Sequence, residues 1–398
     1  MLGRLLHLAG ITFTIFELDK EPNFRSQGGT LDLHTDTGLA ALKAAGLYDE
    51  FLKHARFDGE ALLVADKKLT PWFQLSGAKP GSGRGRPEID RSNLREILLE
   101  SLPKDVIQWD HHLRRVDEDG TLHFDNGTTK KFDLIIGVDG AWSKVRALLS
   151  DQKPFYSGLG GYSFTIPDAN QAPEVSEIIN RGSCYTFSDG RSITGQQMGD
   201  GSLWISAYDR RDENWMKESS YDITNAQEVK AALRKEYADW SPKLVDFINK
   251  SSDKIVARNL YMLPVGFSWD HKPGFTLLGD AAHLMTPFAG EGVNLAFRDC
   301  LELCKRLIPA LKSGSKDALD KSIRDYEVDM FQRAKKAQTL TLGKMNDMYF
   351  TPGAPRTSID SWLLRSVEFQ LGPILKPITY PLAALGIYGY FAFVRLQK

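Results

Sequence analysis

The residues best suited to chemistry lie in one run, LLGDAAHLMTPFAGEGVNLAFRD, at positions 277–299. An apolar strand is expected at 275–278, Asp280 follows it, and a glycine-flanked helix start is expected at 290–294. A carboxylate at a strand end can accept a hydrogen bond from a sugar-alcohol hydroxyl, and glycines at a helix start let backbone N–H groups approach an anionic ligand. The run predicts a site for a polyhydroxylated ligand with an anionic edge. The alternative is an ordinary strand–loop–helix unit whose glycines only permit tight packing.

A flavin meets both requirements of this predicted site. Asp280 is expected to hold the ribityl chain through its carboxylate. The backbone amides from Gly290 to Asn294 are expected to face the N1/C2=O edge of the ring, which becomes anionic on reduction.

Three segments of the sequence resemble one enzyme family. The motif GDAAH-x3-PFAGEGVN resembles the ribityl-binding motif of class A flavoprotein monooxygenases, the para-hydroxybenzoate hydroxylase-like group. DLIIGVDGAWSKVR, at 133–146, resembles the Asp-Gly motif of that family. FRSQGGTLDLH at 24–34 and RPEIDRSNLREILLESL at 86–102 are most similar to the tetracycline-inactivating branch. The resemblance covers nearly the whole chain to about residue 350.

The resemblance implies an FAD-dependent monooxygenase. In this family NADPH or NADH binds transiently and reduces the flavin, and oxygen is trapped as a flavin C4a-hydroperoxide. The implied reaction is hydroxylation or epoxidation of a hydrophobic polycyclic, aromatic or terpenoid metabolite, in secondary metabolism or antibiotic modification. The sequence shows no Ser-His-Asp order, no metal-ligand spacing and no CxxC pair, so we predict no catalytic side chain and no metal site. Two alternatives stay open: a flavin-deficient truncated paralogue acting as a binding protein, and a flavin reductase that does not transfer oxygen.

The resemblance also assigns site residues position by position. The implied cofactor contacts are Glu17, Arg25, Asp32, Arg95, Asp139, Gly140, Arg146, Gly279, Asp280, Pro287, Gly290, Gly292, Val293 and Asn294. The implied substrate contacts are Thr165, Arg181, Trp204, Pro287, Gly290 and Met348. Thr165 and Trp204 stand where the tetracycline-inactivating branch has a glutamine and a histidine, which disfavours tetracycline itself. Trp204 can instead pack inward from a sheet, and Met348 can belong to the core. His283 is expected to pack or hydrogen-bond within its loop.

The start of the chain departs from the family pattern. A dinucleotide-binding unit opens with a buried strand, a G-x-G-x-x-G turn and a helix, and its second strand ends in an acid ~20 positions beyond the glycines. Here the second strand is expected at 11–16 and ends at Glu17, which puts the glycine turn before residue 1. Residues 2–8 are then expected to form the helix that follows the turn. We expect the first strand and the phosphate loop to be missing, through a clipped gene model or in a genuine short form.

These elements predict an α/β fold. We expect a Rossmann-like FAD-binding domain without its first strand, an inserted antiparallel-sheet substrate domain, and C-terminal helices. The FAD-binding domain is expected at 1–154 and 273–350, the substrate domain at 155–272 and an apolar tail at 351–398. Alternating aromatic segments between 155 and 262 indicate the antiparallel strands.

Composition and charge limit the partners of the protein. The 398 residues are 42% hydrophobic and 25% charged, which supports a large core. The formal net charge is -1 with dispersed Lys and Arg, so we expect no nucleic-acid binding. The only cysteines are Cys184, Cys300 and Cys304, which predicts no disulfide framework and a reducing, cytoplasmic location. Cys300 and Cys304 lie one helical turn apart and are expected to be buried rather than to bind metal. We expect a monomer that binds a small hydrophobic substrate.

The end of the chain is strongly apolar. Residues 378–394 (ITYPLAALGIYGYFAFV) carry no charge, and Lys376, Arg395 and Lys398 flank them. A spanning helix needs ~20 apolar residues, so this segment is at the lower limit. Two interpretations stay open: membrane contact, peripheral or through a C-terminal anchor, and a tail docked on the protein surface.

Overall fold

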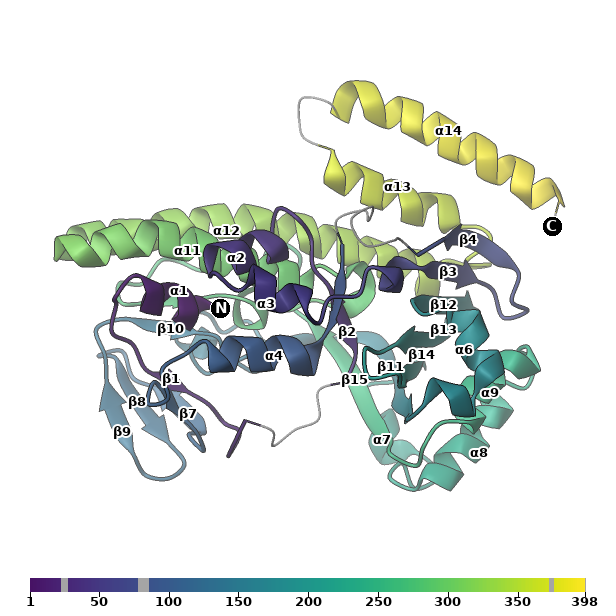
Figure 1. The fold of residues 1–398 in the computed structure, drawn as a ribbon, viewed down its shortest axis with the longest axis horizontal. Helices are drawn as coiled ribbons and strands as arrows, with labels where there is room; N and C mark the ends of the chain where they lie inside the picture. Colours follow the sequence, from purple (N-terminus) through teal and green to yellow (C-terminus); the bar gives the residue numbers. More distant parts are fainter. Residues whose placement is uncertain (23–27, 78–85, 372–375, 398) are drawn as a thin grey trace. The chain divides into compact units, whose positions relative to one another are not determined.

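The computed structural model describes residues 1–22, 28–77, 86–371 and 376–397 (Figure 1). The chain forms two compact units, each assembled from three segments. The first unit contains Met1–Ala55, Ile89–Phe155 and Tyr261–Gln338. The second unit contains Arg56–Glu88, Tyr156–Leu260 and Thr339–Lys398. Contacts between distant parts of the sequence therefore hold each unit together.

Short parallel strands lie at the centre of the first unit. Its parallel pairs are β1 (Ile15–Phe16) with β6 (Ile107–Gln108), and β10 (Ile135–Gly137) with β16 (Phe275–Leu277). A three-stranded antiparallel sheet in the same unit contains β7 (Leu113–Val116), β8 (Thr121–Phe124) and β9 (Thr129–Lys131). Parallel strands need long crossover connections, which usually contain a helix. The mixture of strand pairs and helices confirms the predicted α/β class.

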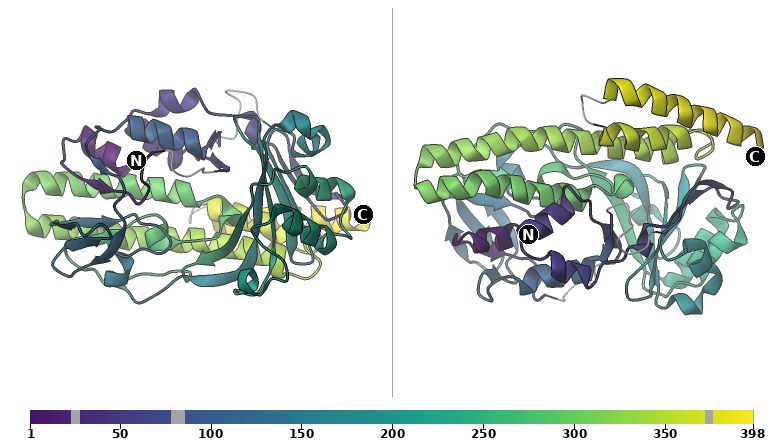
Figure 2. Two further views of the ribbon diagram at one scale, coloured as in Figure 1. Left: turned by 90° about the horizontal axis from the view of Figure 1, so that it is seen from below. Right: turned by 45° about the horizontal axis from the view of Figure 1, so that its top comes forward.

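The longest helix that lies wholly within the first unit is α11 (Gly292–Ser313), which runs beside the first part of α12 (Lys316–Met345) (Figure 2). It packs against α1 (Leu2–Leu8) and α2 (Gly38–Ala44) with a face that buries Leu303 and Leu307 almost completely. The shorter helices of this unit are α3 (Tyr48–Leu52), α4 (Arg91–Glu100), α5 (Arg146–Leu149) and α10 (Asp280–His283). This packing fixes the start of α11, where the glycine motif lies.

A seven-stranded sheet forms most of the second unit. Its strand order is β15 (Val256–Met262), β11 (Phe155–Ile166), β14 (Leu203–Arg210), β13 (Arg191–Gln197), β12 (Ser183–Ser188), β3 (Leu62–Ala65) and β4 (Pro71–Leu75). Among the described pairings, β3 with β12 is parallel and the others are antiparallel. The predicted antiparallel sheet is thus confirmed.

One face of this sheet carries the hydrophobic core of the second unit. Alternate strand residues such as Tyr162, Ile193 and Ile205 pack with Val229 and Phe247. The covering helices are α6 (Pro173–Ile179), α7 (Trp215–Glu218), α8 (Ala226–Glu236) and α9 (Pro242–Asn249). Asn225 caps α8 by accepting from the amides of Gln227 and Glu228. The sequence analysis indicated the strands of this unit and not these covering helices.

The two units differ from the domain boundaries expected from the sequence. The segment 56–88 was assigned to the cofactor domain, but its strands β3 and β4 extend the second-unit sheet beside β12. The chain returns to the first unit at Tyr261 rather than near 273. Pairing with a distant strand determines where β3 belongs, and no local composition signals it.

The C-terminal residues fold into two helices of the second unit. After a π-helical turn at Asn346–Phe350, the chain forms α13 (Ile359–Gln370) and α14 (Lys376–Gln397). These two helices lie side by side in both figures (Figures 1 and 2). The segment expected to be an apolar tail is therefore a helical pair.

Candidate functional site

Asp280 lies at the point where the strand β16 gives way to α10. Gly279, directly before it, has φ 62° and ψ -145°, a conformation that residues with a side chain rarely adopt. The side chain of Asp280 is exposed, yet the protein around it displaces enough water to raise the pKa of the carboxyl above its ordinary value, against the opposing charges of His283 and Arg91. Asp280 is therefore an accessible carboxylate in a poorly hydrated place, which favours a hydrogen bond from a ligand hydroxyl.

The N-terminus of α11 presents backbone donors beside this carboxylate motif. Gly290 has φ 69°, and a Cβ built on Gly292 would meet no atom within 4 Å. Glu291 occupies the N-cap position, but its side chain makes no capping hydrogen bond to the helix, and the first turn of α11 contains no acidic residue. The first amides of a long helix therefore remain available, with the positive end of the helix dipole, for an anionic ligand edge.

Asn294 holds the start of α11 against the segment after β2 (Thr30–Asp32). Its buried side-chain oxygen accepts from the His34 amide at 2.8 Å and from Thr37 Oγ1 at 3.1 Å. Its Nδ2 donates to the Asp32 carbonyl at 2.8 Å. The predicted role of Asn294 rested on its backbone amide, whereas the structure gives its side chain a positioning role. A Cβ on Gly38 would approach the Asn294 oxygen to 2.7 Å, so a glycine keeps this space open.

The carboxylate of Asp32 has a partner that the sequence analysis did not identify. His34 Nε2 lies 2.9 Å from Asp32 Oδ2, and His34 Nδ1 lies 3.8 Å from Glu291 Oε2. A Cβ on Gly290 would approach Asp32 Oδ1 to 3.1 Å, which places this carboxylate next to the glycine motif. The available signal was the spacing of two residues, which puts Asp32 and His34 on one side of an extended chain.

A buried ionic cluster fixes α10 after Asp280. His283 Nε2 lies 2.6 Å from Asp299 Oδ2, and Arg333 Nη2 lies 3.1 Å from Asp299 Oδ1. The amide of Gly279 also donates to Asp299 Oδ2, at 3.3 Å. His283 and Asp299 are almost completely buried, so the expectation that His283 would hydrogen-bond was correct, although its partner lies on α11 rather than in its loop.

Arg146 joins the Asp-Gly motif to the turn that carries Asp280. Asp139 accepts from Ser143 Oγ at 2.5 Å and from the Lys144 amide at 2.6 Å, which orders the turn before α5. Arg146 is only 3% exposed and donates to the Ala281 carbonyl at 2.9 Å. Burial lowers the pKa of this guanidinium. Arg146 thus links the two motifs as a positioning residue, and Gly140, with φ 74°, supplies a bend within the Asp-Gly motif.

The residues predicted to hold the remainder of the cofactor lie near the end of β1. Glu17 Oε1 accepts from the Asp19 amide at 3.0 Å. Arg95 Nη2 lies 3.2 Å from the Asp19 carboxylate, which is nearly buried. The sequence analysis selected Arg95 but missed its partner Asp19. Arg25 lies outside the described residues.

In the second unit, Trp204 lies on the sheet face opposite the hydrophobic core. It alternates along β14 with Leu203 and Ile205, which are fully buried against the helices, while Trp204 is only partly buried. The interpretation that Trp204 packs inward with the core is therefore wrong. Register places Trp204 between Thr165 of β11 and Gln196 of β13 on the same face.

Polar side chains continue this row across the sheet. Gln196 Nε2 donates to Ser183 Oγ at 3.3 Å and to Tyr185 Oη at 3.2 Å. We call the row Thr165, Trp204, Gln196 and Ser183, with Tyr185 beside it, the polar sheet face. It combines one large aromatic surface with a few hydrogen-bonding groups, which is the usual character of a small-molecule site.

The other predicted substrate residues differ in exposure. Arg181 adopts φ 64° in the turn after α6, and its exposed guanidinium lies 2.6 Å from Asp58. Pro287 and Gly290 are exposed in the first unit. Met348 is only 1% exposed within the π-helical turn, so its side chain belongs to the core, and the prediction that it contacts substrate is corrected.

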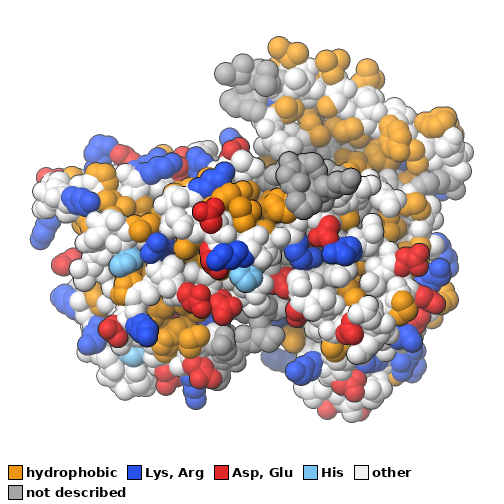
Figure 3. Space-filling model, in the orientation of Figure 1, with side chains coloured by type: hydrophobic (Ala, Val, Ile, Leu, Met, Phe, Trp, Pro, Cys, Tyr) orange, Lys and Arg blue, Asp and Glu red, His pale blue; other side chains and the backbone are white. Residues whose placement is uncertain are grey.

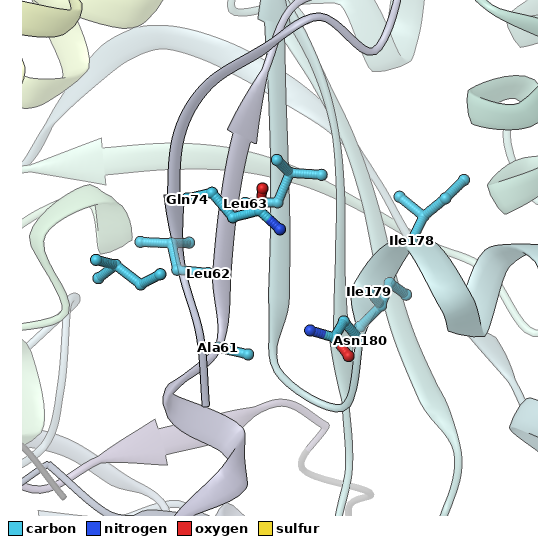
Figure 4. A pocket seen from close by; sticks show the side chains of 8 residues that line it. Ala61, Leu62, Leu63, Gln74, Ile178, Ile179 and Asn180 are labelled. Carbon is cyan, nitrogen blue, oxygen red and sulfur yellow. The ribbon is translucent and has the colours of Figure 1, made fainter. Parts of the chain in front are cut away.

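A small cavity in the second unit is not a substrate site. It lies between β3, β4 and the end of α6, with Leu62, Gln74 and Asn180 in its wall (Figure 4). Its volume of about 20 Å³ is enough for one water molecule at most.

A model of the FAD binding domain family matches residues 1–339 of the chain. The chain belongs to the FAD-dependent monooxygenases. Monooxygenase penA of Penicillium thymicola is 30% identical over 396 residues, which cover 86% of this chain and 90% of penA. Klebsiella pneumoniae HpxO, solved with FAD and uric acid, superposes with a TM-score of 0.71 at 17% identity and covers 97% of this chain and 93% of its own. Tetracycline destructase Tet(55) gives a TM-score of 0.68 at 18% identity, with 92% of each chain covered. Structures of the tetracycline-inactivating branch are thus among those that share this fold.

The residues of the monooxygenase fit FAD as the cofactor. Asp280 offers an acceptor for a ribityl hydroxyl, and the uncapped amides of α11 suit the anionic edge of the ring.

The three cysteines are free and buried, and burial raises the pKa of Cys300 to about 11 and that of Cys184 and Cys304 to about 12. Within the described ranges, His, Cys, Asp and Glu form no group of three or more suited to a metal ion.

Proposed function

We propose that this monooxygenase uses NAD(P)H and O2 to hydroxylate or epoxidise a hydrophobic metabolite that is polycyclic, aromatic or terpenoid. The observation that carries the substrate class is the position of Trp204 on the polar sheet face. An indole that packs in a core serves stability, whereas an accessible indole beside hydrogen-bonding groups offers a flat apolar surface for a ring system.

When bound, FAD would supply the redox and oxygen-transfer chemistry, with NAD(P)H as the electron donor. The residues of this chain would bind and orient it: Asp280 would accept a hydrogen bond from the ribityl chain, and the amides at the start of α11 would bind the anionic edge of the ring. Asn294 keeps those amides in place through the 32–37 segment. Asp299 holds the turn that carries Asp280 through the amide of Gly279. These contacts orient the ring without adding a catalytic side chain.

On the polar sheet face, Trp204 stacks against the apolar rings of the substrate. Gln196 and Tyr185 supply hydrogen bonds that fix its orientation. Two structural neighbours are associated with ring compounds: HpxO was solved with uric acid, and Tet(55) is a tetracycline destructase. These neighbours support a ring-containing substrate.

Oxygen uptake by the flavin-loaded protein tests this proposal. With NADPH and a panel of polycyclic, phenolic and terpenoid compounds, an accepted substrate should accelerate NADPH oxidation and carry one oxygen atom from isotopically labelled O2. Substrate reduction without incorporated oxygen would identify a flavin reductase. A protein that binds the substrate but retains no flavin and oxidises no NADPH would be a binding protein. Either result would overturn the proposal.

A further inference from the structure

The outward side of α14 is apolar along its whole length. Hydrophobic side chains cover this helix in the space-filling view (Figure 3). The exposed large side chains are Ile378 at 67%, Leu382 at 68%, Leu385 at 74%, Tyr388 at 50%, Tyr390 at 61%, Phe393 at 59% and Leu396 at 87%. Ile378, Leu382, Leu385, Phe393 and Leu396 recur at helical spacing and form a stripe, which we call the outer stripe. Tyr390 lies toward α13 instead, in the wall of a cavity between the two helices. A helix that faces water normally has polar residues on its outer side.

The length and composition of α14 are those of a membrane helix. Its 22 residues include an apolar stretch of which only 6% is buried in the protein. At 1.5 Å per residue the helix is about 33 Å long. By length and composition alone it could cross a bilayer.

Polar contacts at both ends nevertheless hold α14 alongside α13. Lys376 Nζ lies 2.7 Å from Glu368 Oε1 at the start of α14. Near its end, Arg395 Nη2 lies 2.9 Å from Asp360 Oδ2, and Arg395 Nε donates to the Arg356 carbonyl at 2.6 Å. Phe391 is almost fully buried on this inner side. A helix that crossed a bilayer would carry one of these ends away from α13 and break its contacts.

The space between the two helices is also apolar. A cavity of about 360 Å³ lies between α13, α14 and Phe73, with Val367, Ile387 and Phe391 in its wall. The inner side of α14 is therefore incompletely packed. Both sides of the helix offer few polar groups to which water could hydrogen-bond.

We propose that α14 lies flat in the surface of a lipid bilayer, with the outer stripe in the acyl-chain region and α13 on the aqueous side. The exposed apolar side chains and the length of α14 favour lipid over a protein partner, because they are those of a membrane helix. Charge adds less: residues 371–398 contain three Lys or Arg and no Asp or Glu, but Lys376 and Arg395 already pair with Glu368 and Asp360 of α13. The exposed Tyr388 and Tyr390 are the amphipathic aromatic type that lies at membrane interfaces. The chain remains a monomer, and the monooxygenase works at a membrane surface where hydrophobic compounds collect.

Vesicle flotation of the full-length, flavin-loaded protein tests the lipid contact. Phosphatidylcholine vesicles containing phosphatidylserine should carry the protein with them, and pure phosphatidylcholine vesicles should carry less. The variant Leu382→Gln/Leu385→Gln/Phe393→Gln should reduce the vesicle-bound fraction by about tenfold or more, because three apolar side chains no longer enter the lipid. A matched control, Val256→Gln/Val328→Gln, changes exposed valines outside α14 and should leave binding unchanged.

Depth measurements distinguish a flat helix from a spanning one. Because the native cysteines are buried, Leu382→Cys and Leu396→Cys can be labelled singly with a fluorophore. Depth-dependent lipid quenchers should place both labels at the same shallow depth. Labels at clearly different depths would show a spanning helix and overturn the flat orientation.

Self-association is the competing explanation for the outer stripe. Light scattering without vesicles should show a monomer for the wild type and for the Gln variant. A dimer that the Gln substitutions dissociate, together with no vesicle binding by the wild type, would overturn the membrane proposal. Unchanged flavin content and circular dichroism in each variant confirm that it is folded.

Discussion

The flavin motif of the first unit and the polar sheet face of the second unit are built in different ways. Around the flavin motif, side chains from distant parts of the chain fix the backbone: Asp299 bonds to His283 and the Gly279 amide, and Asn294 bonds to residues near 34. The polar sheet face is held by the strand ladder, in which Gln196 pairs with Trp204 and donates to its neighbours Ser183 and Tyr185.

This difference separates what must stay constant from what can change. Every flavin monooxygenase must bind the same ribityl chain and ring edge, so the backbone there needs precise support. Substrates differ, and a side chain that projects from a regular ladder can be exchanged without disturbing the ladder. The comparison predicts larger structural effects in the first region and larger specificity effects in the second.

The largest expected effect follows from Asp299→Ala. The change leaves His283 and Arg333 without their buried carboxylate, and breaking a buried ionic contact costs about 3–5 kcal/mol. Urea denaturation should show this loss. Asp329→Asn serves as the control, because Asp329 also contacts Arg333 but is 40% exposed, and it should cost about 1 kcal/mol or less. Equal losses in the two variants would contradict the central role of the buried cluster.

Neighbouring residues on opposite sides of β14 sharpen the comparison. Ile205→Ala removes a fully buried side chain and should cost about 2–5 kcal/mol. Trp204→His alters the polar sheet face and should cost about 1 kcal/mol, while the accepted substrates shift toward more polar ring compounds. Thermal melting and substrate-stimulated NADPH oxidation measure both effects. A large drop in melting temperature for Trp204→His with an unaltered substrate profile would reject a substrate role for Trp204.

Asp280→Ala tests the cofactor contact itself. Loss of a hydrogen bond to a charged acceptor costs about 1.5–3 kcal/mol, so the FAD dissociation constant should rise by about tenfold or more. Stability without flavin should change little, because the side chain of Asp280 is exposed and lies outside the core. Flavin titration measures the affinity, with the exposed Asp270→Ala as the control. Unchanged affinity would assign Asp280 another role.

The smallest expected effect is a pH dependence of the first unit. Burial alone would lower the pKa of His271, but its hydrogen bonds to Asp320 and Glu327 outweigh burial and raise the pKa above 6.5. The stabilisation is fully present below about pH 6.5 and is lost as the pH rises through the raised value. Urea midpoints between pH 6 and pH 9 should fall more steeply for the wild type than for His271→Gln, which cannot gain the proton. Parallel curves would show that His271 contributes no pH dependence.

Local sequence was sufficient for the elements with strong patterns. The strand at 275–277 and the helix that begins at the glycines both lie where the apolar run and the glycine motif placed them. The family was recognisable because a flavin requires a carboxylate after a strand and glycines at a helix start. In this chain these residues form one continuous motif.

Tertiary structure alone decided the partners and the faces. The sequence offered no signal that Asp299 would meet His283 and Arg333, or that Asn294 would bind the segment near His34, because these contacts join residues far apart in the chain. Residues 62–65 joined the second-unit sheet through pairing with β12, and Met348 became core through burial in a π-helical turn. The sequence by itself determined the cofactor and the enzyme family, because the residues of the cofactor-binding motif are neighbours in the sequence. Long-range packing determined which side chains support the cofactor site and which face of the sheet carries the hydrophobic core.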